Sequence, residues 1–164
     1  MGVDISMHIV SKDGELKYQD IFDGRDTRWF DNISHNVIDD IYDSFPSKYG
    51  LPENSPEIAR HAFEHREEGF YDFFYISVEE FMKWFLYKRP DIDAGWVCTY
   101  DKWLYEKKGV IPELAHYLDK DLNPNDYHFI EVEGSYEGSR WVYEFITGHS
   151  DIHPEDNIVY YFDC

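Results

Sequence analysis

The two ends of the chain carry the pattern that most constrains its fold, because apolar side chains recur there at every second position. In residues 3–10, apolar and polar residues alternate, and a period of two predicts a strand with one buried face. The turn-forming sequence "SKDG" follows at 11–14, so we expect a hairpin whose returning strand covers 15–22. The alternating apolar positions of the first strand are Val3, Ile5, Met7 and Ile9.

The last third of the chain has the same strand-like character. Segments 127–134, 139–148 and 157–164 alternate or run apolar over the length of a typical strand. Gly134 and Gly138 lie between the first two segments and predict a hairpin that joins them.

The middle of the chain instead carries helical patterns and helix start signals. Ser77 and Glu80 form a capping box, which predicts a helix that ends before Pro90. Residues 70–76 precede that helix as a short strand or extended link. Four further helices are expected at residues 34–45, 55–68 and 93–109 and, as a short one, from Pro112 onward.

These patterns together predict an α+β fold. We expect a mainly antiparallel sheet built from N- and C-terminal strands, with the central helical segment packed on one face. The 164 residues suit a single domain, 1–164, and the 31 aromatic residues argue against a disordered chain.

The charge is strongly unbalanced, with 34 acids against 15 bases and a formal net charge of −19. Such a field repels nucleic acid and anionic membranes, and it favours basic partners or cations. Solubility alone would explain the same composition, so the charge raises a binding hypothesis without requiring it.

No targeting segment is expected from the sequence. The N-terminus lacks a basic region followed by an unbroken apolar stretch, and no run approaches the ~18 apolar residues of a membrane helix. Two cysteines, Cys98 and Cys164, do not make a disulfide framework. We therefore expect a cytoplasmic protein.

His61, Glu64 and His65 form the order H-x-x-E-H, which is the zinc motif of the inverted metalloproteases. On a helix, two histidines four residues apart share a face and can ligate one ion. The alternative is a solvated helix face of mixed charge, and no dedicated third ligand is evident downstream. A zinc-dependent hydrolase at His61, His65 and Glu64 is therefore the alternative function, and zinc the alternative cofactor.

Two further clusters have both a functional and a structural interpretation. Residues 148–156 could bind a cation from a loop or form a polar turn between two strands. The aromatic residues of segments 127–134 and 139–148 could stack bases or pack in the core, and the acids beside them favour the core. A small nucleotide remains a candidate ligand near three basic residues, Arg25, Arg28 and Arg140.

Other catalytic motifs are missing from the sequence. The chain has no Walker loop, no dinucleotide-binding glycine pattern and no G-x-S-x-G elbow. Carboxylates are so numerous that a pairing argument between any two of them carries no weight.

Four segments occur in an order that resembles a family of small bacteriophage-encoded proteins to which no activity is assigned: "VDISMHI", "RDTRWFDNI", "GLPENSPEI" and "FYDFFYISVEEF". The resemblance covers about residues 1–82. The histidines of that family are not retained, because Ser6 stands at the first and Tyr71 and Phe73 near the later ones. The resemblance implies a phage or prophage origin and no particular reaction.

The charge and the resemblance together favour a binding protein over an enzyme. We expect an acidic phage-type protein that occupies a basic, nucleic-acid-binding host or defence protein in the host cytoplasm, with carboxylates imitating phosphates. Direct binding of nucleic acid or membrane is not expected. The candidate acidic face comprises Asp39, Asp40, Asp43, Glu64, Glu67 and Glu68.

Overall fold

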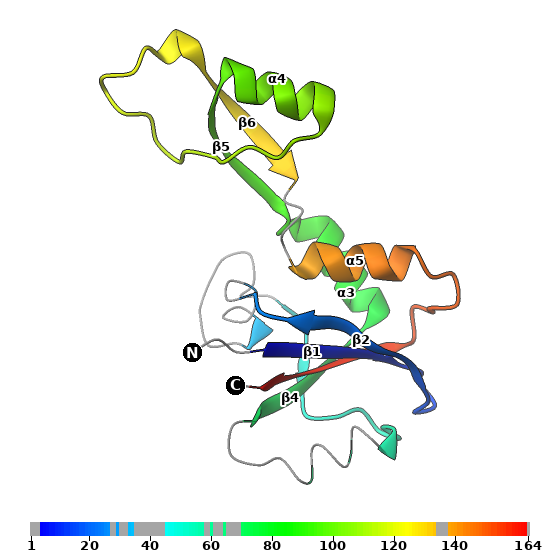
Figure 1. Ribbon diagram of the computed structural model, residues 1–164. Helices are drawn as coiled ribbons and strands as arrows, with labels where there is room; N and C mark the ends of the chain where they lie inside the picture. The colour runs from blue at the N-terminus through cyan, green and yellow to red at the C-terminus, as the bar shows by residue number, and fades with distance from the viewer. Residues whose placement is uncertain are drawn as a thin grey trace. The chain divides into compact units, whose positions relative to one another are not determined.

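The computed structural model describes residues 4–26, 29, 33–34, 45–57, 60, 64, 70–133 and 138–163. The chain divides into two compact units, which we describe separately (Figure 1). Unit 1 comprises Met1–Arg89 and Glu137–Cys164, and unit 2 comprises Pro90–Tyr136. The assignment of a single domain from the sequence stays a prediction.

Unit 1 is built on an antiparallel sheet of five strands, in the order β2-β1-β7-β4-β3. The first and last strands of the chain lie side by side, in continuous register from Asp4 opposite Asp163 to Val10 opposite Asn157. This confirms the predicted α+β fold and its sheet of terminal strands. The strands are β1 (Asp4–Val10), β2 (Leu16–Gly24), β3 (Lys48–Tyr49), β4 (Phe70–Ser77) and β7 (Asn157–Asp163).

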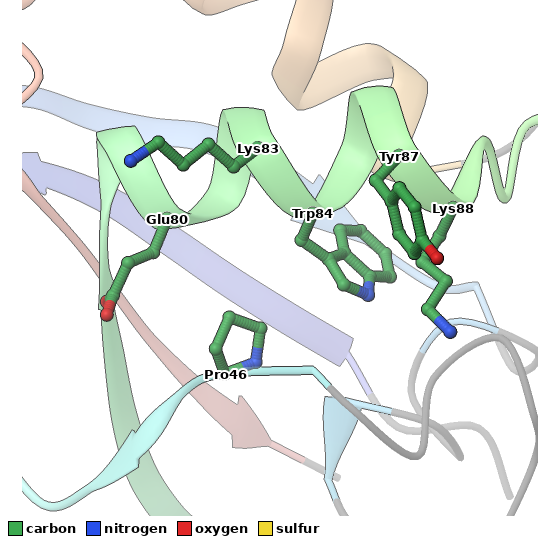
Figure 2. A pocket seen from close by; sticks show the side chains of 6 residues that line it. All are labelled: Pro46, Glu80, Lys83, Trp84, Tyr87 and Lys88. Carbon is green, nitrogen blue, oxygen red and sulfur yellow. The ribbon is translucent and has the colours of Figure 1, made fainter.

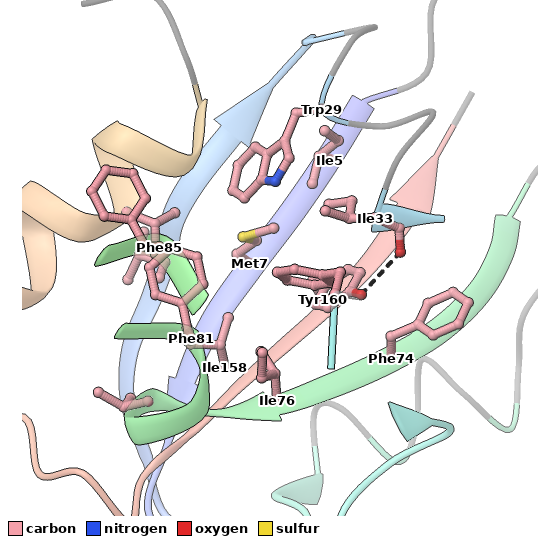
Figure 3. Close-up of a cluster of buried hydrophobic side chains, with 14 of the residues drawn as sticks. Ile5, Met7, Trp29, Ile33, Phe74, Ile76, Phe81, Phe85, Ile158 and Tyr160 are labelled. Atoms are coloured by element: carbon pink, nitrogen blue, oxygen red, sulfur yellow. Dashed lines mark hydrogen bonds between the residues drawn. The ribbon is translucent and has the colours of Figure 1, made fainter. Parts of the chain in front are cut away.

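Two helices, α3 (Val78–Lys88) and α5 (Gly138–Thr147), pack on one face of this sheet and enclose the main core (Figure 3). The period-two pattern places every second strand residue in that core, and the helices add residues spaced three or four apart. Each large apolar side chain contributes about 1.5–3 kcal/mol when fully buried. The fully buried strand residues include Ile5, Met7, Ile9, Ile76, Ile158, Tyr160 and Phe162.

The helix α3 has the start and the end that the sequence predicts. The Ser77 hydroxyl accepts a hydrogen bond from the backbone N–H of Glu80 at 3.1 Å, which confirms the predicted N-cap. Arg89 ends the helix in the left-handed conformation, and its N–H donates to the carbonyl of Phe85. Pro90 follows at once.

The strand predicted for residues 139–148 is wrong, because this segment forms the helix α5. Val142 and Ile146, four residues apart, are buried in the core, whereas Trp141 is 59 % exposed. The Asp26 carboxylate accepts from the N–H of Gly138, so a distant side chain satisfies one of the first N–H groups of the helix. Local sequence periodicity does not reveal this contact, because the two residues are far apart in the chain. The alternating aromatic residues of the segment indicate a strand instead.

The hairpin predicted between 127–134 and 139–148 is also wrong. The strand β6 (Tyr127–Glu133) is confirmed, but it pairs with β5 (Ile92–Cys98), which precedes it in the chain. Gly138 begins α5 rather than a strand, and a Cβ there would lie 2.2 Å from the ring of Trp29. The glycine therefore permits close packing and does not mark a turn.

Unit 2 consists of this two-stranded sheet, the helix α4 (Thr99–Lys108) and the short 3-10 helix η1 (Pro124–Asp126). The helix predicted over 93–109 is correct only in its second half, because residues 92–98 form β5. No helix begins at Pro112; that segment makes a bridge in which Ala115 pairs with Trp96. β-strand pairing with distant residues overrides the local helical pattern in both places.

Part of the opposite face of the unit 1 sheet is also buried, since Val10, Phe73 and Val159 are at most 1 % exposed. Segment 51–57 approaches this region at the β1–β2 turn, where the carbonyl of Asn54 lies against Gly14. Residues 57, 60 and 64 are helical within the helix predicted for 55–68, and most of the helix predicted for 34–45 lies outside the described residues. Within the described part of the chain, no helix has the length and apolar character needed to cross a membrane.

Candidate functional site

Most of the residues that the sequence singled out lie outside the described part of the chain. Glu64 is helical and exposed. The other acids of the predicted face, Asp39, Asp40, Asp43, Glu67 and Glu68, are not described, and neither are the two histidines of the zinc motif, His61 and His65. The acidic face and the zinc site on this helix therefore stay predictions.

The loop at residues 148–156 connects α5 to β7, and not two strands as the sequence suggested. Its side chains bind the protein itself. Asp151 accepts from the hydroxyl of Tyr18 at 2.7 Å, which lowers the pKa of that carboxyl group. Glu155 pairs with Lys12 at 2.9 Å. Asp156, almost wholly buried, pairs with Lys17 at 2.8 Å.

These contacts explain why the loop does not gather ligands. The ring of His149 stacks on Phe145, with 4.1 Å between the ring centroids, and its Nδ1 lies 2.6 Å from the Phe145 carbonyl oxygen. Among the described residues, no group of three or more His, Cys, Asp or Glu side chains is placed to hold a metal ion. The loop instead fastens α5 and β7 to the β1–β2 hairpin.

A β-bulge in β2 gives the neighbouring edge of the sheet its particular shape. Met7 pairs with Phe22 and Ile9 with Tyr18, so three residues of β2 lie opposite the single residue His8. The central one, Asp20, has a φ of +53°, a left-handed conformation that a non-glycine residue adopts only when its surroundings hold it. Bulges of this kind redirect side chains at the edges of sheets.

The imidazole of His8 holds this bulge in place. Its Nδ1 accepts from the backbone N–H of Asp20 at 3.0 Å, and its Nε2 lies 3.4 Å from the hydroxyl oxygen of Tyr161. An accepting Nδ1 requires the neutral ring with the proton on Nε2. Burial lowers the pKa of His8, and the carboxylates of Asp20 and Asp23 offset part of that shift.

A groove of about 490 Å³ lies beside the bulge, between the outer edge of β2 and the helix α5. We call it the β2–α5 groove. Trp141 and Phe145 line it from α5, one turn apart, and the indole Nε1 of Trp141 donates to the carbonyl of Ile21 at 3.0 Å. The complete lining is Asp20, Ile21, Phe22, Asp23, Gly24, Arg25, Trp141 and Phe145.

The charge within the β2–α5 groove is negative. Arg25 lines it, but its Nε is paired with the Asp4 carboxylate at 2.6 Å. The exposed carboxylate of Asp20 lies 3.8 Å from His8 Nδ1, and a neutral imidazole does not compensate it. Among the described residues, no lysine or arginine is paired with Asp20 or Asp23. The groove thus combines two uncompensated carboxylates with an exposed indole.

The sequence points to the aromatic residues of this groove but not to its acidic residues. Trp141 and Phe145 are among the aromatic residues of segment 139–148, and in the predicted strand they would share a face with Tyr143. Asp20 and Asp23 carried no signal, because only the bulge brings them beside α5. Of the three basic residues near which the sequence suggested a nucleotide, Arg25 pairs with Asp4, Arg140 pairs with Glu144, and Arg28 lies outside the described residues. The nucleotide ligand stays a prediction.

The chain matches no protein-family model, no curated protein and no solved structure in comparisons with known proteins. The resemblance to phage proteins accordingly stays a prediction. Function must be argued from the geometry and charge of the chain itself.

Proposed function

We propose that this chain is a binding protein for a basic protein partner, which it engages through the β2–α5 groove. The observation that carries the proposal is the combination of Asp20, Asp23 and the exposed ring of Trp141 in one groove of about 490 Å³. No reaction is required of the site, since its chemistry is that of charge pairing and apolar contact.

A lysine or arginine side chain of the partner suits both the aromatic part and the acidic part of this groove. Its aliphatic stem would lie against Phe145 and Trp141, and its charged group would reach the two carboxylates. A cation over an indole ring gains about 0.5–1 kcal/mol at an exposed site. Tryptophan is also among the residues that contribute most to protein interfaces.

The net charge of −19 supports the same class of partner at longer range. It attracts a basic protein and raises the rate of encounter, particularly at low salt. A nucleic-acid-binding host or defence protein, as the sequence led us to expect, presents lysine and arginine side chains spaced to contact phosphates. Occupancy of those side chains would block nucleic acid without any chemistry.

A labelled ten-residue arginine peptide tests the groove by fluorescence anisotropy. The double variant D20N/D23N should weaken its binding about tenfold, since two favourable charge pairs of about 0.7 kcal/mol each are lost. The control E53Q/E57Q removes the same charge from two exposed acids elsewhere in unit 1. It should leave the affinity within about twofold.

The variant W141A tests the aromatic part of the groove and should weaken binding by a comparable factor. Circular dichroism confirms that each variant is folded. Equal losses in D20N/D23N and E53Q/E57Q would mean that only the overall charge attracts the peptide, and the groove would then be rejected as the binding site.

A further inference from the structure

A groove of about 540 Å³ lies along the helix α3 in unit 1, lined in part by Pro46 and Trp84 (Figure 2). The Trp84 ring is only 6 % exposed, because it packs edge-on against Phe45 with 4.7 Å between the ring centroids. That ring is therefore part of the core and has no open face for a ligand. An open surface of a different kind lies at the edge of the sheet in unit 2.

The strand β6 has a free outer edge. Its inner side pairs with β5 along the whole strand, and β5 is paired on its other side as well, where Trp96 forms a bridge with Ala115. Within the part of the chain that the structure describes, no strand pairs with the outer side of β6. An unpaired edge of this kind is a template on which another chain can add a strand.

The hydrogen bonds of Trp96 show which backbone groups of β6 point outward. Its N–H donates to the Ala115 carbonyl at 2.7 Å, and its carbonyl accepts from the Ala115 N–H at 3.0 Å, so both groups point away from β6. Directly opposite residues of an antiparallel pair exchange both hydrogen bonds or neither. Phe129, opposite Trp96, therefore has its N–H and C=O on the outer edge, and so does Glu131 two residues later.

This outer edge is regular and open over a short stretch. Among the described residues, no group accepts from or donates to the outward N–H and C=O of Phe129 and Glu131. The stretch ends where the Tyr127 N–H donates to a carbonyl of η1 and where the Glu133 N–H donates to the Tyr105 hydroxyl at 3.4 Å. Bulges, lysines and prolines commonly protect an edge, and β6 contains none of them.

The side chains at this edge favour a strand that is basic at one position and apolar at the next on the same face. Val132 is buried under α4, so its neighbours at alternate positions, Phe129 and Glu131, face away from that helix, and both are exposed. Among the described residues, no lysine or arginine is paired with Glu131. Opposite charges directly across two strands stabilise the pair and like charges destabilise it, whereas an aromatic residue favours a β-branched or aromatic one.

We propose that the outer edge of β6 binds an extended basic segment of a protein partner as an added antiparallel strand. The segment carries a lysine or arginine opposite Glu131 and, two residues later, an apolar residue opposite Phe129. A second copy of this chain is disfavoured as the occupant, because β6 itself contains two glutamates and each copy has a net charge of −19. The proposal does not rest on the β2–α5 groove.

Hydrogen exchange and amide NMR of the whole protein with the acetylated, amidated peptide TTTRTVTT test this proposal. The peptide can place its arginine opposite Glu131 and its valine opposite Phe129. We expect saturable shifts along β6 below about 1 mM peptide. At about ten times the Kd, the amides of Phe129 and Glu131 should exchange about tenfold more slowly, because they exchange only from the free protein. No saturable shift would overturn the proposal.

Two N-methylated peptides separate backbone pairing from charge attraction, since they have the same side chains and the same charge. Methylation of the arginine and valine nitrogens removes the N–H groups that donate to β6 and should weaken binding at least about tenfold. Methylation of the two threonines that follow them alters N–H groups that point away from β6 and should change the affinity by less than about threefold. Equal affinities of the two peptides would contradict strand addition. Protection of the same amides that rises with protein concentration alone would identify a second copy as the occupant and would also contradict the proposal.

Variants of the chain test the charge and the edge separately. E131Q should weaken the peptide about threefold, since one exposed charge pair is lost. The control E113Q removes an exposed acid from the segment on the other side of β5 and should have no effect. Equal losses in the two variants would reject Glu131 as the residue that selects the basic strand, and with it the proposal.

F129P removes an outward N–H without removing a hydrogen bond to β5, so it should abolish the protection of Glu131. F129A lacks the same ring but keeps the N–H, and it should retain that protection. The amide spectrum of each variant reports whether unit 2 is folded. Equal protection of Glu131 in folded F129P and F129A would show that no strand is added at this edge.

The variant D20N/D23N should leave the protection of Phe129 and Glu131 unchanged, because it alters only the β2–α5 groove. Failure of the peptide at β6 would therefore leave the proposed function at that groove intact, and the reverse also holds.

Discussion

His8 is a buried imidazole whose neutral form is part of the fold. Its Nδ1 can accept from Asp20 N–H only while it is unprotonated, and Asp20, Asp23 and Tyr161 are the polar groups that face it. Protonation would place a second donor against that N–H and disrupt the bulge that shapes the β2–α5 groove. A single residue on the inner strand thus controls the position of a side chain at the sheet edge.

The stability of the protein should therefore depend on pH through His8. Burial lowers its pKa in the folded state below the ordinary value of 6.5, so the unfolded state binds more protons as the pH falls below 6.5. The contribution of His8 to stability is complete above that pH and is lost progressively below it. Thermal unfolding at pH 7.5 and 5.5 should show a drop in Tm.

The variant H8N isolates this effect, because an asparagine carbonyl can accept from Asp20 N–H and does not titrate. H8N should be less stable than the wild type at pH 7.5, and it should lose less stability on going to pH 5.5. An identical drop in both proteins would assign the pH dependence to other groups.

At the scale of the elements, the β1–β2 turn depends on one glycine for two separate reasons. Gly14 has a φ of +89°, and a Cβ placed there would lie 1.5 Å from the carbonyl oxygen of Asn54. Any side chain would therefore strain the turn and also push segment 51–57 away from it.

Gly50 provides the matched control for this turn, because it has a φ of +96° and nothing within 4 Å of the added Cβ. We expect G50A to cost about 1 kcal/mol, the backbone strain alone. G14A should cost clearly more than that, and urea unfolding measures both. Equal losses would show that the contact with Asn54 is not maintained in solution.

The whole molecule has its main core within unit 1. Every residue of the large apolar cluster belongs to Met1–Arg89 or Glu137–Cys164, including the two helices on the sheet. Unit 2 buries a smaller set, such as Val97 and Val132, under α4. The five-stranded sheet therefore does not draw its core from the inserted unit.

Replacement of residues 90–136 by a short glycine–serine linker should leave unit 1 folded. We expect a cooperative thermal transition and a near-ultraviolet circular dichroism spectrum from the buried aromatics, since the packing of Trp29, Phe81 and Tyr160 is retained. A non-cooperative transition would show that unit 1 requires unit 2. The same shortened chain should still bind the arginine peptide, because the β2–α5 groove lies in unit 1.

Each unit carries a share of the acidic and basic residues that is close to its share of the chain length. Unit 2 is a little over a quarter of the chain and contains ten of the 34 acids and four of the 15 bases. Neither unit is the acidic part of the molecule, so net charge cannot by itself select a binding surface. Local geometry, such as the bulge at Asp20, must supply that selection.

The sequence by itself determined the elements whose stability is local. Strands β1, β2, β6 and β7 follow from alternation of side chains, and the start of α3 follows from the Ser77 cap, because these signals depend only on near neighbours in the chain. The α+β class and the sheet of terminal strands followed from the order of those elements.

Only the tertiary structure decided the features that join distant residues. The helix α5 begins where Asp26 caps Gly138 across more than one hundred residues, and residues 92–98 form a strand because β6 pairs with them. The β2–α5 groove likewise requires His8 to hold the bulge at Asp20 beside Trp141. Local periodicity in the sequence cannot predict such contacts, because their free energy depends on residues that become neighbours only when the chain is folded.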